Sequence, residues 1–256
     1  MTVLVSGSDE SSGRHHRSIF LHGGFVAPEE DWSNLFASAW QKSVLTGPPT
    51  IPYLHMTEIR SRAWREKHGL SAAEAERRVD EAFLVIESVG SLTPISSQIN
   101  GGRFRDEFPS KMRVASGAMK KFEPDYIGFI GYVFVVLAYL EQEHLEVEKV
   151  DFIVERKTGI TQQLKEFYDS MPKPLEELGL ASQAKLLGEL IPASKDRVPL
   201  QAADVLCWHS QRAETGRLSR IDENRYATLA RRRGCRHEWT DDDITKLKLA
   251  LSKSGP

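Results

Sequence analysis

The sequence predicts an α/β domain with a mixed β-sheet, in which the first strands are antiparallel, the later strands are parallel and helices cover both faces. Two apolar segments, residues 3–9 and 18–26, flank a short polar turn, so we expect them to pair as antiparallel strands. Helical and strand-like segments then alternate, as in parallel sheets with crossover helices. No long linker rich in Pro, Gly and Ser divides the chain. We therefore expect one domain over residues 1–215 and a polar, arginine-rich, partly helical C-terminal extension over residues 216–256.

The segment after the second strand is predicted to be helical. Pro28 is a favourable first helical residue, and large apolar side chains recur near helical spacing up to Leu45. The Gly-Pro-Pro sequence at 47–49 should end this helix, since proline cannot continue it. Residues 51–60 show no clear period, and we expect an extended segment there.

A capping pattern marks the next helix. Ser71 is a good N-cap and Glu74 completes a capping box, so a helix is expected from there to about Ala82. The apolar segments 83–89 and 95–100 then predict strands, the second closed by two glycines.

The second half of the chain contains the clearest helix, residues 125–145. Its centre is apolar on all sides, so it should pack against the sheet and be covered elsewhere too. Compact apolar strands and further helices then alternate. Strands are expected over 150–154 and 184–190, and helices over 161–169 and 198–212.

Composition indicates a globular, cytoplasmic protein. Apolar residues make up 40% and charged residues 27%, which is typical of a folded domain. The net charge of −2 neither favours nor excludes nucleic acid as a partner. The N-terminus lacks the apolar stretch of a signal peptide, and the longest apolar run, 127–140, is too short to cross a membrane. The two cysteines, Cys207 and Cys235, are too few for a disulfide framework or a zinc knuckle.

Three acidic residues stand where the elements of an α/β sheet usually form a site. Asp9 and Glu155 each end a predicted strand, and Asp204 lies in the early turns of a predicted helix. Carboxylates held close together repel one another, and a bound divalent cation commonly reduces this repulsion. Oxygen ligands are those that Mg²⁺ and Mn²⁺ prefer, and two such ions bound side by side can catalyse the cleavage of phosphodiester bonds. The alternative is that both aspartates cap local structure and Glu155 is solvated.

Motifs at both ends of the chain resemble a bacterial family. Asp9-Glu10-Ser11, followed by Gly13 and an apolar strand, looks like the family's opening. Residues 198–206, Val-Pro-Leu-Gln-Ala-Ala-Asp-Val-Leu, resemble its closing helix, and residues 150–155 look like its middle acidic strand. Over about residues 3–212, the order and spacing of these motifs resemble the family called domain of unknown function 3800, which is itself similar to the ribonuclease H-like superfamily.

The resemblance implies a ribonuclease H-like fold and divalent-metal-dependent nuclease or phosphodiester chemistry. Asp9, Glu155 and Asp204 would be the catalytic and metal-binding residues, with Mg²⁺ or Mn²⁺ as cofactor. Glu155 stands where the pattern favours Asp. Glu58, in an H-x-x-E pair with His55, is a candidate further metal ligand or else half of a structural pair. The alternative function is a non-catalytic binding or scaffold module of a mobile-element or defence system.

Two further features bear on substrate binding. Gln201 shares a helix face with Asp204, so it could position a substrate or, as we favour, hydrogen-bond that carboxylate. Residues 212–236 hold eight arginines against three acids, a local charge of +5. This segment could bind the phosphate backbone of a nucleic acid, with Arg231, Arg232 and Arg233 as candidate contacts. Alternatively, it could form a solvated helix face.

Overall fold

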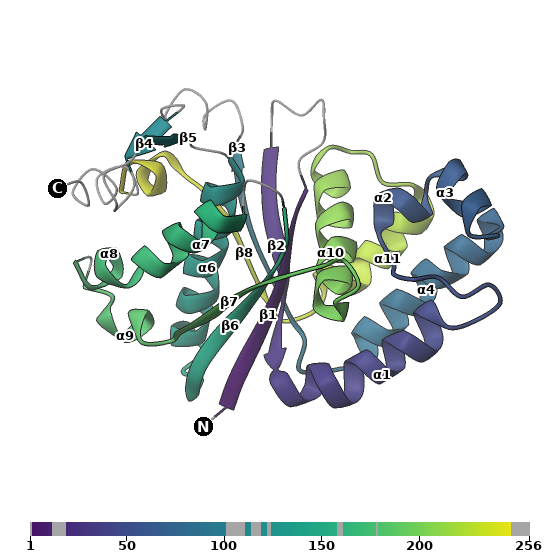
Figure 1. The fold of residues 1–256 in the computed structure, drawn as a ribbon, viewed down its shortest axis with the longest axis horizontal. Coiled ribbons are helices and arrows are strands. Elements are labelled where there is room, and N and C mark those ends of the chain that lie inside the picture. The colour runs from purple at the N-terminus through teal and green to yellow at the C-terminus, as the bar shows by residue number, and fades with distance from the viewer. Residues whose placement is uncertain are drawn as a thin grey trace.

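A central β-sheet between two layers of helices organises the computed structural model of this protein (Figure 1). The structure describes residues 2–11, 19–100, 111–113, 119–121, 124–157, 161–177 and 179–246. In this part of the chain the main sheet has six strands in the order β7-β6-β1-β2-β3-β8. Its strands are β1 (Thr2–Ser11), β2 (Ile19–Pro28), β3 (Thr93–Asn100), β6 (Val147–Glu155), β7 (Leu187–Ala193) and β8 (Cys235–Glu238). The short strands β4 (Lys111–Arg113) and β5 (Met119–Lys121) form a separate antiparallel pair.

The sheet is mixed, as predicted. β1 pairs antiparallel with β2, and β2 antiparallel with β3. On the other side of β1, β6 and β7 follow in parallel, and β8 adds a parallel strand beside β3. The expectation that the first strands are antiparallel and the later ones parallel, with helices on both faces, is therefore confirmed.

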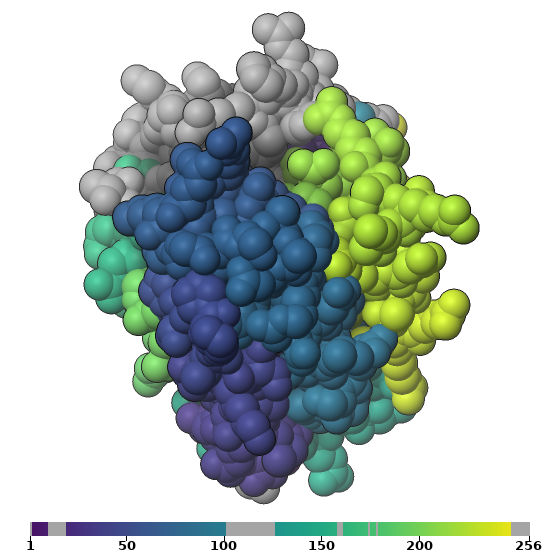
Figure 2. Space-filling view, turned by 90° about the vertical axis from the view of Figure 1, so that its right-hand side faces the viewer, coloured from purple at the N-terminus to yellow at the C-terminus, as the bar shows by residue number. Residues whose placement is uncertain are grey.

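Helices cover both faces of this sheet (Figure 1). One layer contains α6 (Pro124–Gln142), α7 (Thr161–Ser170), α8 (Pro172–Glu177) and α9 (Ala181–Ala184). The other begins with a continuous helical segment of π- and α-type turns, η1 (Asp31–Phe36), α1 (Ala37–Trp40) and η2 (Gln41–Leu45). It continues with α2 (Met56–Ile59), α3 (Arg62–Lys67), α4 (Ala72–Ser88), α10 (Val198–Glu214) and α11 (Arg220–Ala230). In Figure 2, which views this second layer, the blue helices of the first half and the yellow-green C-terminal elements share the surface.

Two hydrophobic cores lie on opposite faces of the sheet because successive strand residues point to opposite sides. On β1, Leu4 packs into the core with α6, whereas Val5 packs into the core with α1, α4 and α10. On β6, Phe152 and Ile153 divide in the same way. The apolar centre of α6 is buried, as predicted, and the contact between the Tyr132 hydroxyl and Ser6 Oγ, at 2.7 Å, satisfies a polar group there.

The strand predicted over 83–89 is wrong, because α4 continues to Ser88. Its buried residues Val79, Ala82, Phe83 and Ile86 recur at spacings of three and four, which is helical rather than strand periodicity. The predicted capping box at the start of this helix is confirmed, with reciprocal hydrogen bonds between Ser71 and Glu74.

Several predicted boundaries also move. Pro28 ends β2 instead of opening a helix, and α2 interrupts the segment predicted as extended over 51–60. β7 begins at Leu187, because residues 181–184 form α9. Asp9 does not end its strand: β1 runs on to Ser11, and Asp9 pairs in register with Gly23 of β2.

The C-terminal segment packs on the sheet and its cores. Leu229 of α11 lies in the core beside α4 and α10, and β8 pairs with β3. After β8, the Trp239 indole N–H donates to Ser97 Oγ at 2.7 Å. The predicted boundary at residue 215 thus falls in the turn between α10 and α11. Throughout the described residues, every helix is too short or too polar to span a membrane.

Candidate functional site

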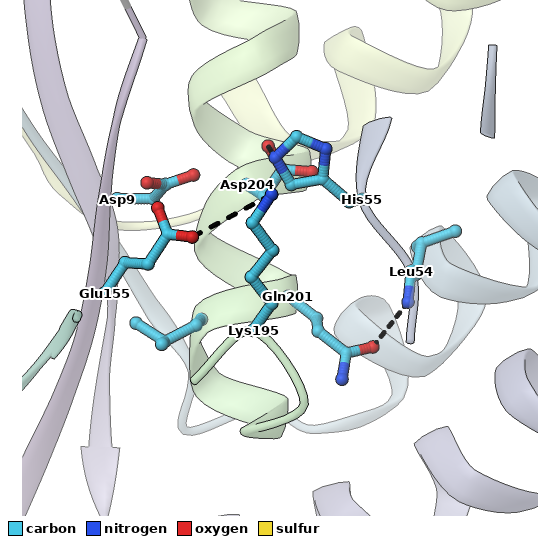
Figure 3. A pocket seen from close by; sticks show the side chains of 8 residues that line it. Asp9, Leu54, His55, Glu155, Lys195, Gln201 and Asp204 are labelled. Carbon is cyan, nitrogen blue, oxygen red and sulfur yellow. Dashed lines mark hydrogen bonds and ion pairs between the residues drawn. The ribbon is translucent and has the colours of Figure 1, made fainter. Parts of the chain in front are cut away.

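Asp9, Glu155 and Asp204 line one pocket at an end of the sheet (Figure 3). β1 and β6 are parallel, and Ser8 is in register with Val154, so Asp9 and Glu155 follow at the same end of neighbouring strands. Asp204 comes from α10, which crosses this part of the sheet. The wall is completed by Leu54, His55, Lys195, Leu200 and Gln201. The free volume is about 10 Å³, which is room for roughly one water-sized particle.

A glycine in β1 allows α10 to approach so closely. A Cβ atom at Gly7 would overlap both the side chain and the backbone of Pro199, near the start of α10. About two turns further along, the Cys207 thiol donates to the backbone carbonyls of Asp9 and Gly23, at 3.2 and 3.3 Å. The first turns of α10 are therefore seated directly on β1 and β2, which places the Asp204 carboxyl group next to that of Asp9.

The Asp9 and Asp204 carboxyl groups hydrogen-bond to each other. Burial raises the pKa of Asp9 to about 7, and Glu155 adds to this shift while Lys157 and Lys195 oppose it. Burial also raises the pKa of Asp204 well above its usual value, and the neighbouring Asp9 raises it further. A hydrogen bond between two carboxyl groups requires a proton, so the pair shares one near neutral pH.

The segment before α2 holds the other side of Asp204. The backbone N–H of Met56 donates to Asp204 Oδ2 at 2.5 Å, and His55 Nε2 lies 3.7 Å from Oδ1. Burial lowers the pKa of His55, and the nearby Lys195 charge lowers it further. His55 is therefore a neutral neighbour of the aspartate pair at physiological pH rather than a counter-ion.

Gln201 positions this segment and does not bind the carboxylate. Its Oε1 accepts from the Trp40 indole N–H and from the Leu54 backbone N–H, each at 2.8 Å. Its Nε2 donates to the Asp196 carbonyl at 3.0 Å, and the residue is only 2% exposed. The favoured prediction of a hydrogen bond to Asp204 is wrong, because these backbone and indole groups use the carboxamide. Its role as a substrate contact stays a prediction.

Two lysines that the sequence reasoning missed bind the remaining carboxylates. The Lys195 ammonium lies 3.2 Å from Glu58 Oε1 and 3.8 Å from Glu155 Oε1, and Lys157 Nζ lies 4.0 Å from Glu155 Oε2. Lys157 follows the end of β6, and Lys195 follows the end of β7. The ends of predicted strands also indicated the acidic candidates, so the same position in the sequence could have identified both lysines.

Hydrogen bonds set the charge states around Glu58. The Tyr53 hydroxyl donates to Glu58 Oε2 at 2.7 Å. Burial alone would raise the pKa of Glu58, but the hydrogen bonds from Tyr53 and Lys195 outweigh it and lower the pKa. Burial raises the pKa of Glu155 despite the opposing charge of Lys195. Glu58 does not itself line the pocket, but it forms an ion pair with Lys195, which does.

The two aspartates offer carboxylate oxygens, the ligand type that a hard divalent cation prefers. Within the described ranges, no group of three or more His, Cys, Asp or Glu side chains is arranged so that it could hold a metal ion. Glu155 is already paired with lysines. Asp9 and Asp204 also hydrogen-bond to each other, and the charges of Lys157 and Lys195 act on Asp9; a cation there would favour the ionised form of both aspartates.

The arginines of residues 212–236 are largely engaged within the protein. Arg232 donates to the carbonyls of Ile86, Val89 and Leu92, which closes the C-terminal end of α4. Arg233 pairs with Glu143, and Arg231 is exposed. None of the three residues Arg231, Arg232 and Arg233 lines the acidic pocket. Contact between this segment and nucleic acid stays a prediction.

Two other side chains on α10, His209 and Cys207, are buried in the protein. His209 is fully buried with Nδ1 2.7 Å from the Val205 carbonyl, and Cys207 is a buried thiol whose pKa burial raises well above the usual value. Neither side chain lines the acidic pocket.

Comparisons of the chain with protein families, with curated proteins and with solved structures found no match.

Proposed function

We propose that this protein is a ribonuclease H-like, divalent-metal-dependent nuclease or phosphodiester-processing enzyme. The observation that carries the proposal is the contact between Asp9, from the first strand, and Asp204, from a helix near the other end of the chain, in one pocket with Glu155. The same three residues are those that the resemblance implies as metal-binding carboxylates. The mixed sheet with its two helical layers supports the same assignment.

In this proposal Asp9 and Asp204 hold Mg²⁺ or Mn²⁺. The bound cation would polarise a phosphoryl oxygen of the substrate. The Met56 N–H donates to Asp204 Oδ2, which fixes the orientation of this carboxyl group. Glu155, whose pKa is raised by burial, is the candidate to accept the proton of an attacking water.

A non-catalytic binding module is the second candidate, and the lysine contacts favour it. A scaffold would neutralise its carboxylates with lysines instead of metal, as Lys157 and Lys195 do for Glu155. In both candidates, the exposed part of the Arg-rich segment around Arg231 would contact nucleic acid.

A cleavage assay separates the two candidates. Purified protein would be incubated with single- and double-stranded DNA and RNA in Mg²⁺, Mn²⁺ or EDTA. Metal-dependent cleavage that is lost in Asp9→Asn and Asp204→Asn, but kept in the exposed control Asp169→Asn, supports the enzyme. Absence of cleavage in every combination, or full activity of both variants, would refute it. Thermal unfolding of each variant would verify that it is folded.

A further inference from the structure

Beyond the acidic pocket, α10 carries a cluster of two arginines around a tryptophan. Asp204, Trp208 and Arg212 are spaced four residues apart, so they lie along the same side of the helix. The guanidinium carbon of Arg212 lies 4.2 Å from the centre of the Trp208 ring. That of Arg60, the residue after α2, lies 5.4 Å from the same centre. We call Arg60, Trp208 and Arg212 the arginine–tryptophan cluster.

The cluster continues the seam between α10 and the segment that holds Asp204. The helix meets this segment at three successive levels, and the pairs in order along the helix are Gln201 with Leu54, Asp204 with Met56 and Trp208 with Arg60. In Figure 2 the blue α2–α3 segment borders the yellow-green elements of the C-terminal half. Eight residues at 1.5 Å each separate Arg212 from Asp204 by about 12 Å, which is roughly three or four nucleotides along a helical strand.

Arg212 has donors to offer an external anion, whereas Arg60 is engaged within the protein. Arg60 pairs with Asp222 at 2.7 Å and also with Glu76. Among the described contacts, Arg212 has no carboxylate partner, and its guanidinium makes a single hydrogen bond, to the Arg217 carbonyl at 3.4 Å. A guanidinium group has five N–H donors, so most of those on Arg212 remain for a ligand.

The acids nearest to Arg212 are paired with other arginines. Glu214, two residues further along, pairs with Arg236 at 2.6 Å. Asp222 acts on Arg212 electrostatically, but its carboxylate already accepts from Arg60 at 2.7 Å. The positive charge of Arg212 is therefore not neutralised by a direct partner in the described part of the chain.

The positive charges around Arg212 also repel one another. Partial burial lowers the pKa of Arg212, and the charges of Arg60 and Arg217 lower it further, while Asp222 opposes them. A bound anion would offset this repulsion. Stacking on Trp208 fixes the plane of the guanidinium group, so its paired N–H donors present the fork geometry that matches a phosphate group.

Building on the proposed function, which makes a nucleic acid the ligand, we propose that Arg212 binds a phosphate group of the nucleic acid strand that reaches the acidic pocket. Trp208 and Arg60 hold the Arg212 side chain in place for this contact. The phosphate belongs to a nucleotide roughly three or four positions from the one at Asp204. A contact of this kind positions the strand by its backbone and does not read its base sequence.

The salt dependence of nucleic acid binding tests this inference without any activity measurement. Fluorescence anisotropy would measure the Kd of short labelled DNA and RNA, single- and double-stranded, in EDTA between about 50 and 200 mM salt. The full-length proteins compared are wild type, Arg212→Gln, Arg212→Lys and the control Lys173→Gln, which removes one charge from a side chain that is 83% exposed in the opposite helical layer.

We expect Arg212→Gln to bind roughly tenfold more weakly than wild type, because it loses a charge-assisted hydrogen bond. The slope of log Kd against log salt should fall by about one, since one phosphate contact is removed. Arg212→Lys should keep the wild-type slope and recover only part of the affinity, because lysine keeps the charge but lacks the planar fork. The control should match wild type in both quantities.

The outcomes distinguish this inference from the proposed function. An unchanged slope and affinity in Arg212→Gln, or an equal loss in the Lys173→Gln control, would overturn the inference and leave metal-dependent cleavage to be decided by its own assay. Absence of binding by wild type would overturn it as well. Binding that depends on Arg212 in a protein that cleaves nothing would support the inference and favour the scaffold. If Arg212→Gln does not fold, Arg212→Met provides the same comparison, because its flexible apolar side chain keeps a contact with Trp208.

Discussion

Replacing Asp9 with Asn should stabilise the protein at neutral pH, although it removes a proposed metal ligand. In the unfolded chain Asp9 loses its proton near the ordinary pKa of 3.8, whereas the folded carboxyl group keeps it until about pH 7. Between these values the folded state binds more protons than the unfolded state, so stability falls as the pH rises. Three pH units at about 1.4 kcal/mol each set an upper limit of roughly 4 kcal/mol, and about 2 kcal/mol is expected because Asp204 shares the proton.

Thermal unfolding between pH 4 and pH 8.5, without divalent ions, measures this effect. Asp9→Asn should unfold near the wild-type temperature at pH 4, and roughly 4–8 °C above it at pH 8, given about 2–4 °C per kcal/mol for a chain of this size. The control Asp169→Asn removes an exposed carboxylate and should show no such pH dependence. An Asp9→Asn variant that is equally destabilised at both pH values would refute the reasoning, because the buried carboxyl group would then carry no pKa-linked cost.

Three further predictions concern the surroundings of the site. Gly7→Ala should destabilise the fold by about 1–3 kcal/mol in urea unfolding, since its methyl group would overlap Pro199; a neutral result would contradict the close packing of α10 on β1. Gln201→Leu should cost roughly 2–4 kcal/mol, because it leaves the Leu54 N–H and the Trp40 indole without their acceptor, and a stability equal to wild type would count against this role. Arg232→Ala should lower the free energy of unfolding by about 1–3 kcal/mol in the same assay, because it removes the hydrogen bonds to the end of α4. Arg231→Ala should change only the salt-dependent binding of nucleic acid, measured by fluorescence anisotropy. The reverse pattern would show that the two roles are misassigned.

The sequence predicted the sheet well because strand patterns and the spacing of elements are local. The antiparallel start, the helix over α6 and the helix at α10 all follow from periodicity and turn residues. The strand predicted over 83–89 failed for a physical reason: Phe83 and Ile86 extend the apolar face of α4, and a short apolar run does not by itself distinguish a strand from a buried helical turn.

The site was predicted only in part, because its contacts join distant segments. Acids near the ends of elements could be chosen from the sequence, and three of them do line one pocket. The proton shared by Asp9 and Asp204, and the lysines beside Glu155, depend on side-chain directions that no spacing rule contains. Gln201 was noticed for its helix face, but its partners Trp40 and Leu54 lie far away in the sequence.

The pairing of Asp9 with Asp204 has a consequence for synthesis on the ribosome. Asp9 lies on β1, its partner belongs to the much later α10, and β8 completes the described sheet edge later still. At roughly 5–20 residues per second, some 10–40 s separate the two aspartates during translation. A nascent chain therefore has no assembled acidic pocket before α10 is synthesised, so any activity that depends on this pair arises only after that point.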